Sequence, residues 1–162
     1  MDVNAFYSVL AGLSFTLLGL WWVACQSRMA WLIDRVGLGM AYVVSLHFVL
    51  PGAMSLLSLV APDAPLMWRI TFATAGLAGM IGSALVIATV RRRASDVGLV
   101  VLLQWVAVPV YALVTVVAIV PTLVTGLGLT PLQVEGIALV VLILLGTQSA
   151  WLVTFAGSPR PD

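Results

Sequence analysis

The sequence predicts an all-α fold, a polytopic bundle of five transmembrane helices, and two features of composition indicate it. The chain is 62% hydrophobic and only 8% charged, whereas a soluble domain carries about 25% charged residues. Five long runs lack Asp, Glu, Lys and Arg altogether: residues 3–27, 36–62, 70–90, 97–134 and 136–159. Because a helix needs about 20 apolar residues to cross a bilayer, each run is long enough for one span.

The five helices are expected at residues 5–26, 37–60, 66–90, 96–120 and 131–155, as one transmembrane domain. The fourth run exceeds one span, but prolines and glycines interrupt it at positions 121, 126, 128 and 131. We therefore expect a helix followed by an apolar connection over residues 120–130, which fits either a plain loop or a re-entrant segment. A fold with four spans and one segment that only dips into the bilayer is the alternative.

The start of the last helix has the clearest local signal. Thr130, Pro131 and Gln133 form a capping box with proline at the first helical position. A hydroxyl and an amide placed three residues apart can each bond the backbone N–H of the other, which satisfies two donors at a helix start.

The distribution of arginine predicts the orientation. Six of the seven basic residues lie in the first loop, the third loop and the C-terminal tail, and only Arg69 lies on the other side. Short loops rich in arginine remain in the cytoplasm. The N-terminus is therefore expected outside and the C-terminus inside, in a plasma membrane, which we take to be a bacterial inner membrane.

Small residues mark the helix faces that are expected to pack, because close backbone approach drives association in lipid. The third helix has Ala75, Gly79 and Ser83 on one stripe and a second small stripe beside it. We expect this helix at the bundle centre or at a subunit interface. The first helix has Gly12 at the middle of a small and polar face, which is expected to look inward.

His47 is the one ionisable side chain expected deep in the membrane, near the midplane of the second helix. Pro51 follows four residues later and Pro109 interrupts the fourth helix, and a proline leaves the carbonyl four residues earlier without its helical donor. Kinks are expected at both prolines. Polar side chains at comparable depth then suggest a buried pocket formed by these residues: His47, Gln104, Tyr111, Gln148 and Thr16.

Two interpretations of His47 remain open. Ionisable groups inside a bilayer are costly and usually face a partner or a wet cavity, which favours a permeant or ligand site. Alternatively, one hydrogen bond to a neighbouring helix satisfies the imidazole and the residue only stabilises the bundle.

Two further charged features lie near the membrane surfaces. Arg69 and Glu135 begin the third and fifth helices on the predicted outer side, so an ion pair between them is expected. Arg91, Arg92 and Arg93 are interpreted as an anchor for topology that could also contact anionic lipid headgroups.

Several kinds of chemistry lack the residues they need. One histidine and one cysteine cannot form a metal site within the chain, and no cofactor is expected. The carboxylates fall mostly in loops, so acid–base catalysis is unsupported and an enzyme is the least favoured class. A net charge of +1 gives no reason to expect nucleic acid as a partner.

The sequence therefore favours a small homo-oligomeric channel or transport-type protein, with its polar site around His47. Secondary transporters are usually built from repeated halves, which this chain lacks, so an oligomer is the natural way to complete a path. A non-catalytic accessory or scaffold subunit of a larger membrane complex is the alternative from another class. A haem- or quinone-associated redox subunit is the third interpretation.

Overall fold

A computed structural model describes residues 3–27, 35–60, 64–91 and 98–156 of the chain. In these ranges the fold consists of helices alone: α1 (Val3–Gln26), α2 (Arg35–Val60), α3 (Pro65–Arg91), α4 (Gly98–Ile119), the 3-10 helix η2 (Pro121–Leu127) and α5 (Pro131–Ala156). All five α-helices are long and apolar enough to cross a membrane. These findings confirm the prediction of an all-helical fold with five candidate membrane spans. The observed helix ends lie within about two residues of the expected ones.

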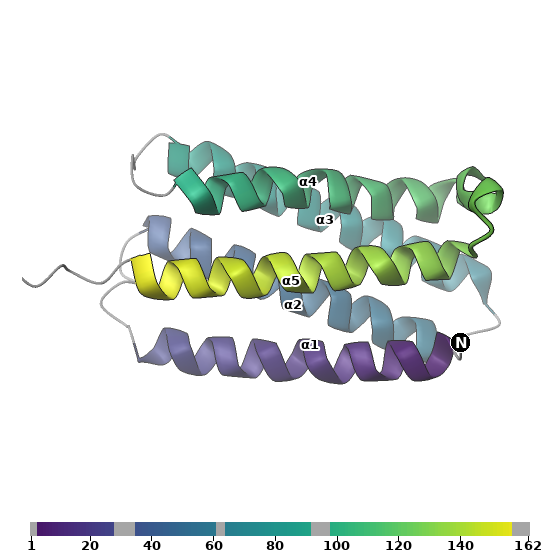
Figure 1. The fold of residues 1–162 in the computed structure, drawn as a ribbon, viewed down its shortest axis with the longest axis horizontal. Helices are drawn as coiled ribbons and strands as arrows, with labels where there is room; N and C mark the ends of the chain where they lie inside the picture. Colours follow the sequence, from purple (N-terminus) through teal and green to yellow (C-terminus); the bar gives the residue numbers. More distant parts are fainter. Residues whose placement is uncertain (1–2, 28–34, 61–63, 92–97, 157–162) are drawn as a thin grey trace, which may run out of the picture.

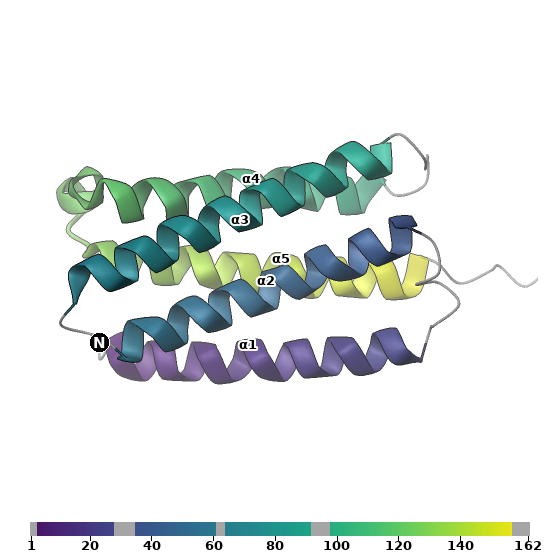
Figure 2. The ribbon, with the colours of Figure 1, turned by 180° about the vertical axis from the view of Figure 1, so that it is seen from behind.

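The five α-helices lie along one common axis, and successive helices run in opposite directions (Figure 1). In Figure 2 α2 passes obliquely in front of α5; it contacts α1, α3 and α5, while α3 and α4 form the most extensive pair. The chain's N-terminus and η2 lie at the same end of the bundle, which we call the η2 end. α1 and α5 begin there, and α2 and α4 end there.

The pairing of α3 with α4 depends on glycines, because these permit the two backbones to approach closely. A Cβ atom at Gly76 would lie 3.0 Å from the carbonyl oxygen of Tyr111. At Gly79 a Cβ atom would overlap the Tyr111 ring itself. The small residues of α3 thus create the space that the largest buried side chain of α4 fills.

Two aromatic side chains of α1 attach this helix to its neighbours. The Tyr7 hydroxyl donates to the carbonyl oxygen of Leu132 in α5 at 2.7 Å. The Trp21 indole N–H donates to the carbonyl oxygen of Ala41 in α2 at 3.2 Å. Both side chains are buried, so these bonds fix the side of α1 that faces the bundle.

The connection between α4 and α5 is a short 3-10 helix at the end of the bundle (Figure 1). Gly128 ends it with a φ of 68°, a left-handed conformation that glycine adopts without strain. The capping box then begins α5. The Thr130 N–H donates to Gln133 Oε1 at 2.9 Å, and the Gln133 N–H donates to Thr130 Oγ1 at 3.3 Å.

Candidate functional site

His47 lies in the middle of α2 and is completely buried. Its Nδ1 is 2.7 Å from the carbonyl oxygen of Val43, one turn earlier in the same helix. A carbonyl oxygen only accepts, so Nδ1 carries the hydrogen, and in the neutral ring Nε2 holds the lone pair. Nε2 is buried and has no hydrogen-bond partner among the described residues. The imidazole therefore presents a free proton acceptor to the bundle interior.

Tyr111 faces His47 from α4. The two rings meet edge to face, with centroids 5.6 Å apart and planes inclined by 66°. Tyr111 is fully buried, and its hydroxyl lacks a hydrogen-bond partner within the described ranges. A buried phenol usually has such a partner, which makes this hydroxyl a second unusual group at the same depth.

A glycine of α5, Gly146, also packs closely against His47. A Cβ atom at Gly146 would lie 2.7 Å from the Cβ of His47 and 3.0 Å from Cε1 of Phe48. Real Cβ atoms do not approach other atoms so closely, so α5 contacts α2 through bare backbone here. His47 and Tyr111 are thus held between two glycines, Gly146 and Gly79, in a tightly packed interior.

Gln104 lies two turns from Tyr111 on the same face of α4, away from the η2 end. Its amide nitrogen donates to Ser149 Oγ of α5 at 3.4 Å, which is a long hydrogen bond. The Gln104 amide oxygen is buried and finds no partner in the part of the chain that the structure describes. Ser149 is also fully buried, and sequence reasoning missed it because serine is common on helix faces that only pack.

Glu135 and Ser55 extend this polar series toward the η2 end. Glu135 lies in the second turn of α5 and is completely buried, with no described hydrogen-bond partner for either carboxylate oxygen. Ser55 lies on α2 two turns beyond His47, and its hydroxyl is buried and likewise unpartnered among the described residues.

Arg69 is oriented differently from the sequence prediction. Its Nε donates to the carbonyl oxygen of Ala118 at 2.9 Å, and Nη2 donates to that of Ile119 at 2.6 Å. The last carbonyls of a helix have no partner within it, and the helix dipole makes them attractive to a cation. Arg69 therefore caps the end of α4 and makes no hydrogen bond with Glu135, in contrast to the expected ion pair.

Together these side chains form a polar row through the interior of the bundle. We use this name for Glu135, Ser55, Tyr111, His47, Gln104 and Ser149, all of which are buried and project from α2, α4 or α5. Fourteen residues separate Glu135 from Ser149 along α5, which corresponds to about 21 Å of helix axis. The hydrocarbon core of a bilayer is about 30 Å thick, so the row covers most of its depth.

Two residues of the sequence-predicted pocket lie elsewhere. Gln148 is exposed on the outer side of α5, and the neighbouring Ser149 occupies the inward position instead. Thr16 is exposed on α1 and donates to the carbonyl oxygen of Gly12 in its own helix. The structure thus brings together His47, Gln104 and Tyr111 but leaves Gln148 and Thr16 on the bundle surface.

The predicted packing residues also lie partly inside the bundle and partly on its surface. Gly79 and Ser83 are buried on α3 and Ala75 is partly buried. Gly12 is exposed, and nothing lies within 4 Å of the position that its Cβ would take. The expectation that this face of α1 looks inward therefore differs from the structure, in which Tyr7, Trp21 and their neighbours occupy the inner face.

The remaining predicted features concern prolines and arginines. Pro51 and Pro109 both lie inside α-helices, Pro51 buried and Pro109 exposed. Of the predicted lipid anchor, Arg91 is the last residue of α3, while Arg92 and Arg93 lie outside the described residues.

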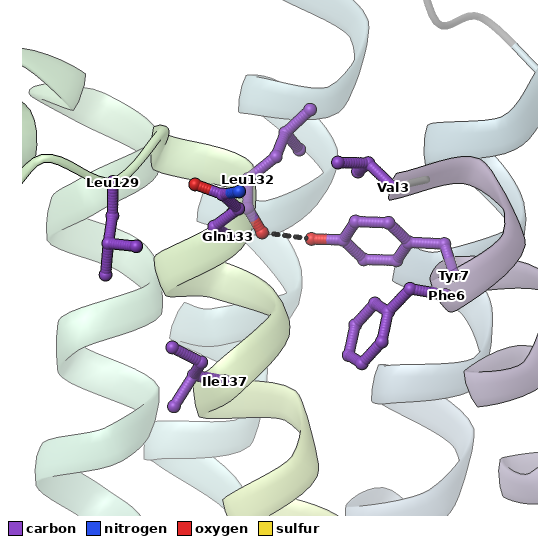
Figure 3. A pocket seen from close by; sticks show the side chains of 7 residues that line it. All are labelled: Val3, Phe6, Tyr7, Leu129, Leu132, Gln133 and Ile137. Atoms are coloured by element: carbon purple, nitrogen blue, oxygen red, sulfur yellow. Dashed lines mark hydrogen bonds between the residues drawn. The ribbon is translucent and has the colours of Figure 1, made fainter. Parts of the chain in front are cut away.

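A pocket of about 190 Å³ opens at the η2 end, between α1 and α5 (Figure 3). Its walls are mainly apolar, formed by Val3, Phe6, Leu129, Leu132 and Ile137, and the polar groups of Tyr7 and Gln133 complete the lining. Figure 3 shows the Tyr7 hydroxyl directed at the carbonyl of Leu132, one turn before Glu135. We call this cavity the η2-end pocket.

The polar row offers proton donors and acceptors but no metal-ligand set. Within the described ranges, no three residues of the types His, Cys, Asp and Glu come close enough together to hold a metal ion. Chemically, the row combines one carboxyl, one imidazole and one phenol with hydroxyl and amide groups.

Comparisons with known proteins identify no relative: no family model, no curated protein and no solved structure matches the chain.

Proposed function

We propose that this chain is a small membrane transport protein in which a polar species crosses the interior of the bundle along the polar row. The observation that supports this is the series of buried, unpartnered polar atoms on three different helices. Inside a bilayer such groups are costly, and they usually mark the pathway of an ion, a proton or a polar substrate.

Structural stabilisation alone accounts poorly for the row. A buried donor or acceptor without a partner costs about 1–3 kcal/mol, and the free energy of unfolding of a whole domain is only about 5–15 kcal/mol. His47 and Gln104 each have one polar side-chain atom bonded and one without a partner among the described residues, and the Tyr111 hydroxyl has no partner there either. Apolar side chains of similar size would fill the same space without this cost.

We also infer how the protein lies in its membrane. Arg35 begins α2 and Arg91 ends α3 at the end opposite the η2 end. The sequence has four more arginines in the same two loops and the C-terminal tail, so we infer that this side is cytoplasmic and the N-terminus external. A bacterial plasma membrane is the location we propose, with the chain assembled as a homo-oligomer surrounded by lipid.

The direct test is flux through the purified protein in sealed lipid vesicles. Uptake of Na⁺, K⁺, Cl⁻, protons and small neutral solutes would be measured for the wild type, for His47→Gln and for Gln148→Leu. We expect at least one species to cross in the wild type, with the rate at least tenfold lower in His47→Gln. Gln148→Leu changes an exposed polar residue of α5 and should retain the wild-type rate.

Thermal unfolding of each variant provides the control for folding. Equal flux in the wild type and in His47→Gln would contradict the role of His47 in transport. The absence of flux for every species tested would contradict the proposed function.

An accessory subunit is the second candidate function, and the outward face of α1 favours it. Ser8, Gly12 and Gly19 are exposed there, and a Cβ at either glycine would meet nothing within 4 Å. Small residues on a lipid-facing surface allow another helix to approach closely. The mass of the particle extracted in mild detergent distinguishes the candidates: a stoichiometric unrelated partner favours the accessory subunit, and a homo-oligomer favours transport.

A further inference from the structure

The polar row is too tightly packed at its centre to hold a hydrated ion. A single added methyl group at Gly146 would collide with His47, and one at Gly79 would collide with the Tyr111 ring. Metal cations need a cage of several oxygen ligands to replace their water, and the centre presents one ring nitrogen and one hydroxyl as its unpartnered atoms. A species that moves between such single atoms must be very small.

Groups that can bind and release a proton recur along the row. The Glu135 carboxyl lies toward the η2 end, and His47 and Tyr111 lie at the centre. Because Nδ1 of His47 donates to Val43, Nε2 is the atom that gains a proton when the ring becomes charged. Hydroxyl and amide groups that can bond to water or to a proton carrier lie on both sides of His47. Ser55 lies toward the η2 end, and Gln104 and Ser149 lie toward the opposite end.

Resting on the proposed function, we propose that the transported species is the proton, and that Glu135 is the group that exchanges protons with the η2 side. This assigns a role to the one carboxyl that the structure buries inside a span without a hydrogen-bond partner among the described residues. His47 Nε2 then serves as the acceptor at mid-depth.

Glu135 lies close to the η2-end pocket along α5, although it is not one of the residues that line the pocket. Leu132 and Gln133 line this pocket from the first turn of α5, and Glu135 follows in the next turn. Tyr7 lies on the pocket wall, and its hydroxyl donates to the carbonyl oxygen of Leu132, one turn before Glu135. The proposed exchange therefore needs a path of about one helical turn from the pocket to the buried Glu135 carboxyl.

At the η2 end, the charged and titratable side chains of the other described helices are bonded to groups other than Glu135. α1 contributes Tyr7, whose hydroxyl hydrogen is engaged by the Leu132 carbonyl. α3 contributes Arg69, whose guanidinium is engaged by the end of α4. α2 contributes only serine hydroxyls at this end, and Ser58 donates to the carbonyl oxygen of Ser55. On α4 this end holds Thr115, whose hydroxyl donates to the carbonyl oxygen of Tyr111, and the apolar Val117 and Ala118.

One transfer cycle moves one proton from the η2 side to the opposite side in three steps. A proton from the η2 side binds the Glu135 carboxylate and forms the neutral acid. The acid releases it, through water that enters the row, to His47 Nε2, so the carboxylate is restored and the ring becomes imidazolium. Release past Gln104 and Ser149 to the opposite side restores the neutral ring, and the net result is the movement of one proton.

The test uses the full chain in proteoliposomes that contain a pH-sensitive dye. An outward K⁺ gradient with valinomycin drives proton entry, and the dye reports the initial rate. The variants are Glu135→Gln, which keeps the shape but cannot exchange a proton, Glu135→Asp, which restores a carboxyl, and the exposed control Gln148→Leu. Matched vesicles without valinomycin are also tested for Na⁺, K⁺ and neutral solute flux.

We expect the wild type and Gln148→Leu to carry protons, Glu135→Gln to be at least tenfold slower, and Glu135→Asp to recover part of the rate. Equal proton rates in the wild type and Glu135→Gln would overturn the role of Glu135. Solute or metal-ion flux in the wild type, without proton flux, would overturn the proton assignment and leave the proposed function standing. No flux of any species would overturn both.

Discussion

The ring of Tyr111 meets the ring of His47 edge to face, with 5.6 Å between the centroids. Such a contact contributes about 0.5–1.5 kcal/mol beyond the burial of the two rings. It joins α2 to α4 and leaves both the Tyr111 hydroxyl and His47 Nε2 without a hydrogen-bond partner among the described residues. The arrangement therefore fixes the position of the two rings through packing and keeps their polar atoms available.

The packing of Tyr111 on α3 leads to a prediction for glycine substitutions. Gly79→Ala places a methyl group where the Tyr111 ring lies, so the ring or the helix must shift. Overpacking of this kind costs about 1–3 kcal/mol, and thermal unfolding in detergent would show a lower midpoint. Gly12→Ala is the matched control, because its methyl group would enter open space and should not lower the midpoint. Equal midpoints for the two variants would contradict the close contact.

The capping role of Arg69 leads to a second prediction. Arg69→Met removes the donors to the carbonyls of Ala118 and Ile119, and the free energy of unfolding should fall by about 1–3 kcal/mol. Glu135→Gln should have a smaller effect on stability, because the structure shows no hydrogen bond to either Glu135 oxygen from any described residue. If the arginine instead formed an ion pair with Glu135, the two substitutions would destabilise similarly and their effects would not add in the double variant.

The start of α5 supplies a third prediction. Thr130→Ala removes the hydroxyl that accepts from the Gln133 N–H and should cost about 1 kcal/mol of stability. Thr130→Ser retains the hydroxyl and should unfold at nearly the wild-type temperature. Equilibrium unfolding of the three proteins would measure the difference, and an equal loss in both variants would indicate that the hydroxyl is not the stabilising group.

The proposed orientation gives a fourth prediction, which reporter fusions can check. A fluorescent protein that matures only in the cytoplasm, fused after residue 162, should be bright, and an alkaline phosphatase at the same position should be inactive. Moving three arginines to the second loop, while replacing Arg91, Arg92 and Arg93 by Gln, should shift the balance toward the opposite orientation. An active phosphatase on the unmodified chain would reverse the proposed sidedness.

Sequence reasoning places the helices well because their signals are local. The length of each charge-free run decides whether it can span a membrane, and the sequence Thr130, Pro131 and Gln133 marks a helix start. These signals depend on neighbouring residues alone. The apolar connection between α4 and α5 is also anticipated, but not its 3-10 conformation, in which Val124 is buried.

The rotation of each helix is harder to predict, because the side facing lipid is as apolar as the side facing protein. Gln148 and Ser149 are neighbours, and only the second lies inside, a difference of about 100° of helix rotation. The small residues around Gly12 resemble a packing face, yet the aromatic side of α1 faces the bundle through Tyr7 and Trp21. Arg69 illustrates the same limit: its depth is readable, but its choice of the α4 carbonyls depends on tertiary structure.

We propose that His47 belongs to a path connected to water, and one measurement tests this directly. The chain has a single histidine, so solid-state NMR of protein labelled with ¹⁵N-histidine in bilayers reports one imidazole without ambiguity. We predict a protonated Nδ1, an Nε2 that carries a lone pair at neutral charge, and rapid transfer of water magnetisation to Nε2. Transfer to Nε2 no faster than to the buried backbone of Leu142 would show a sealed, purely structural histidine and would contradict the account.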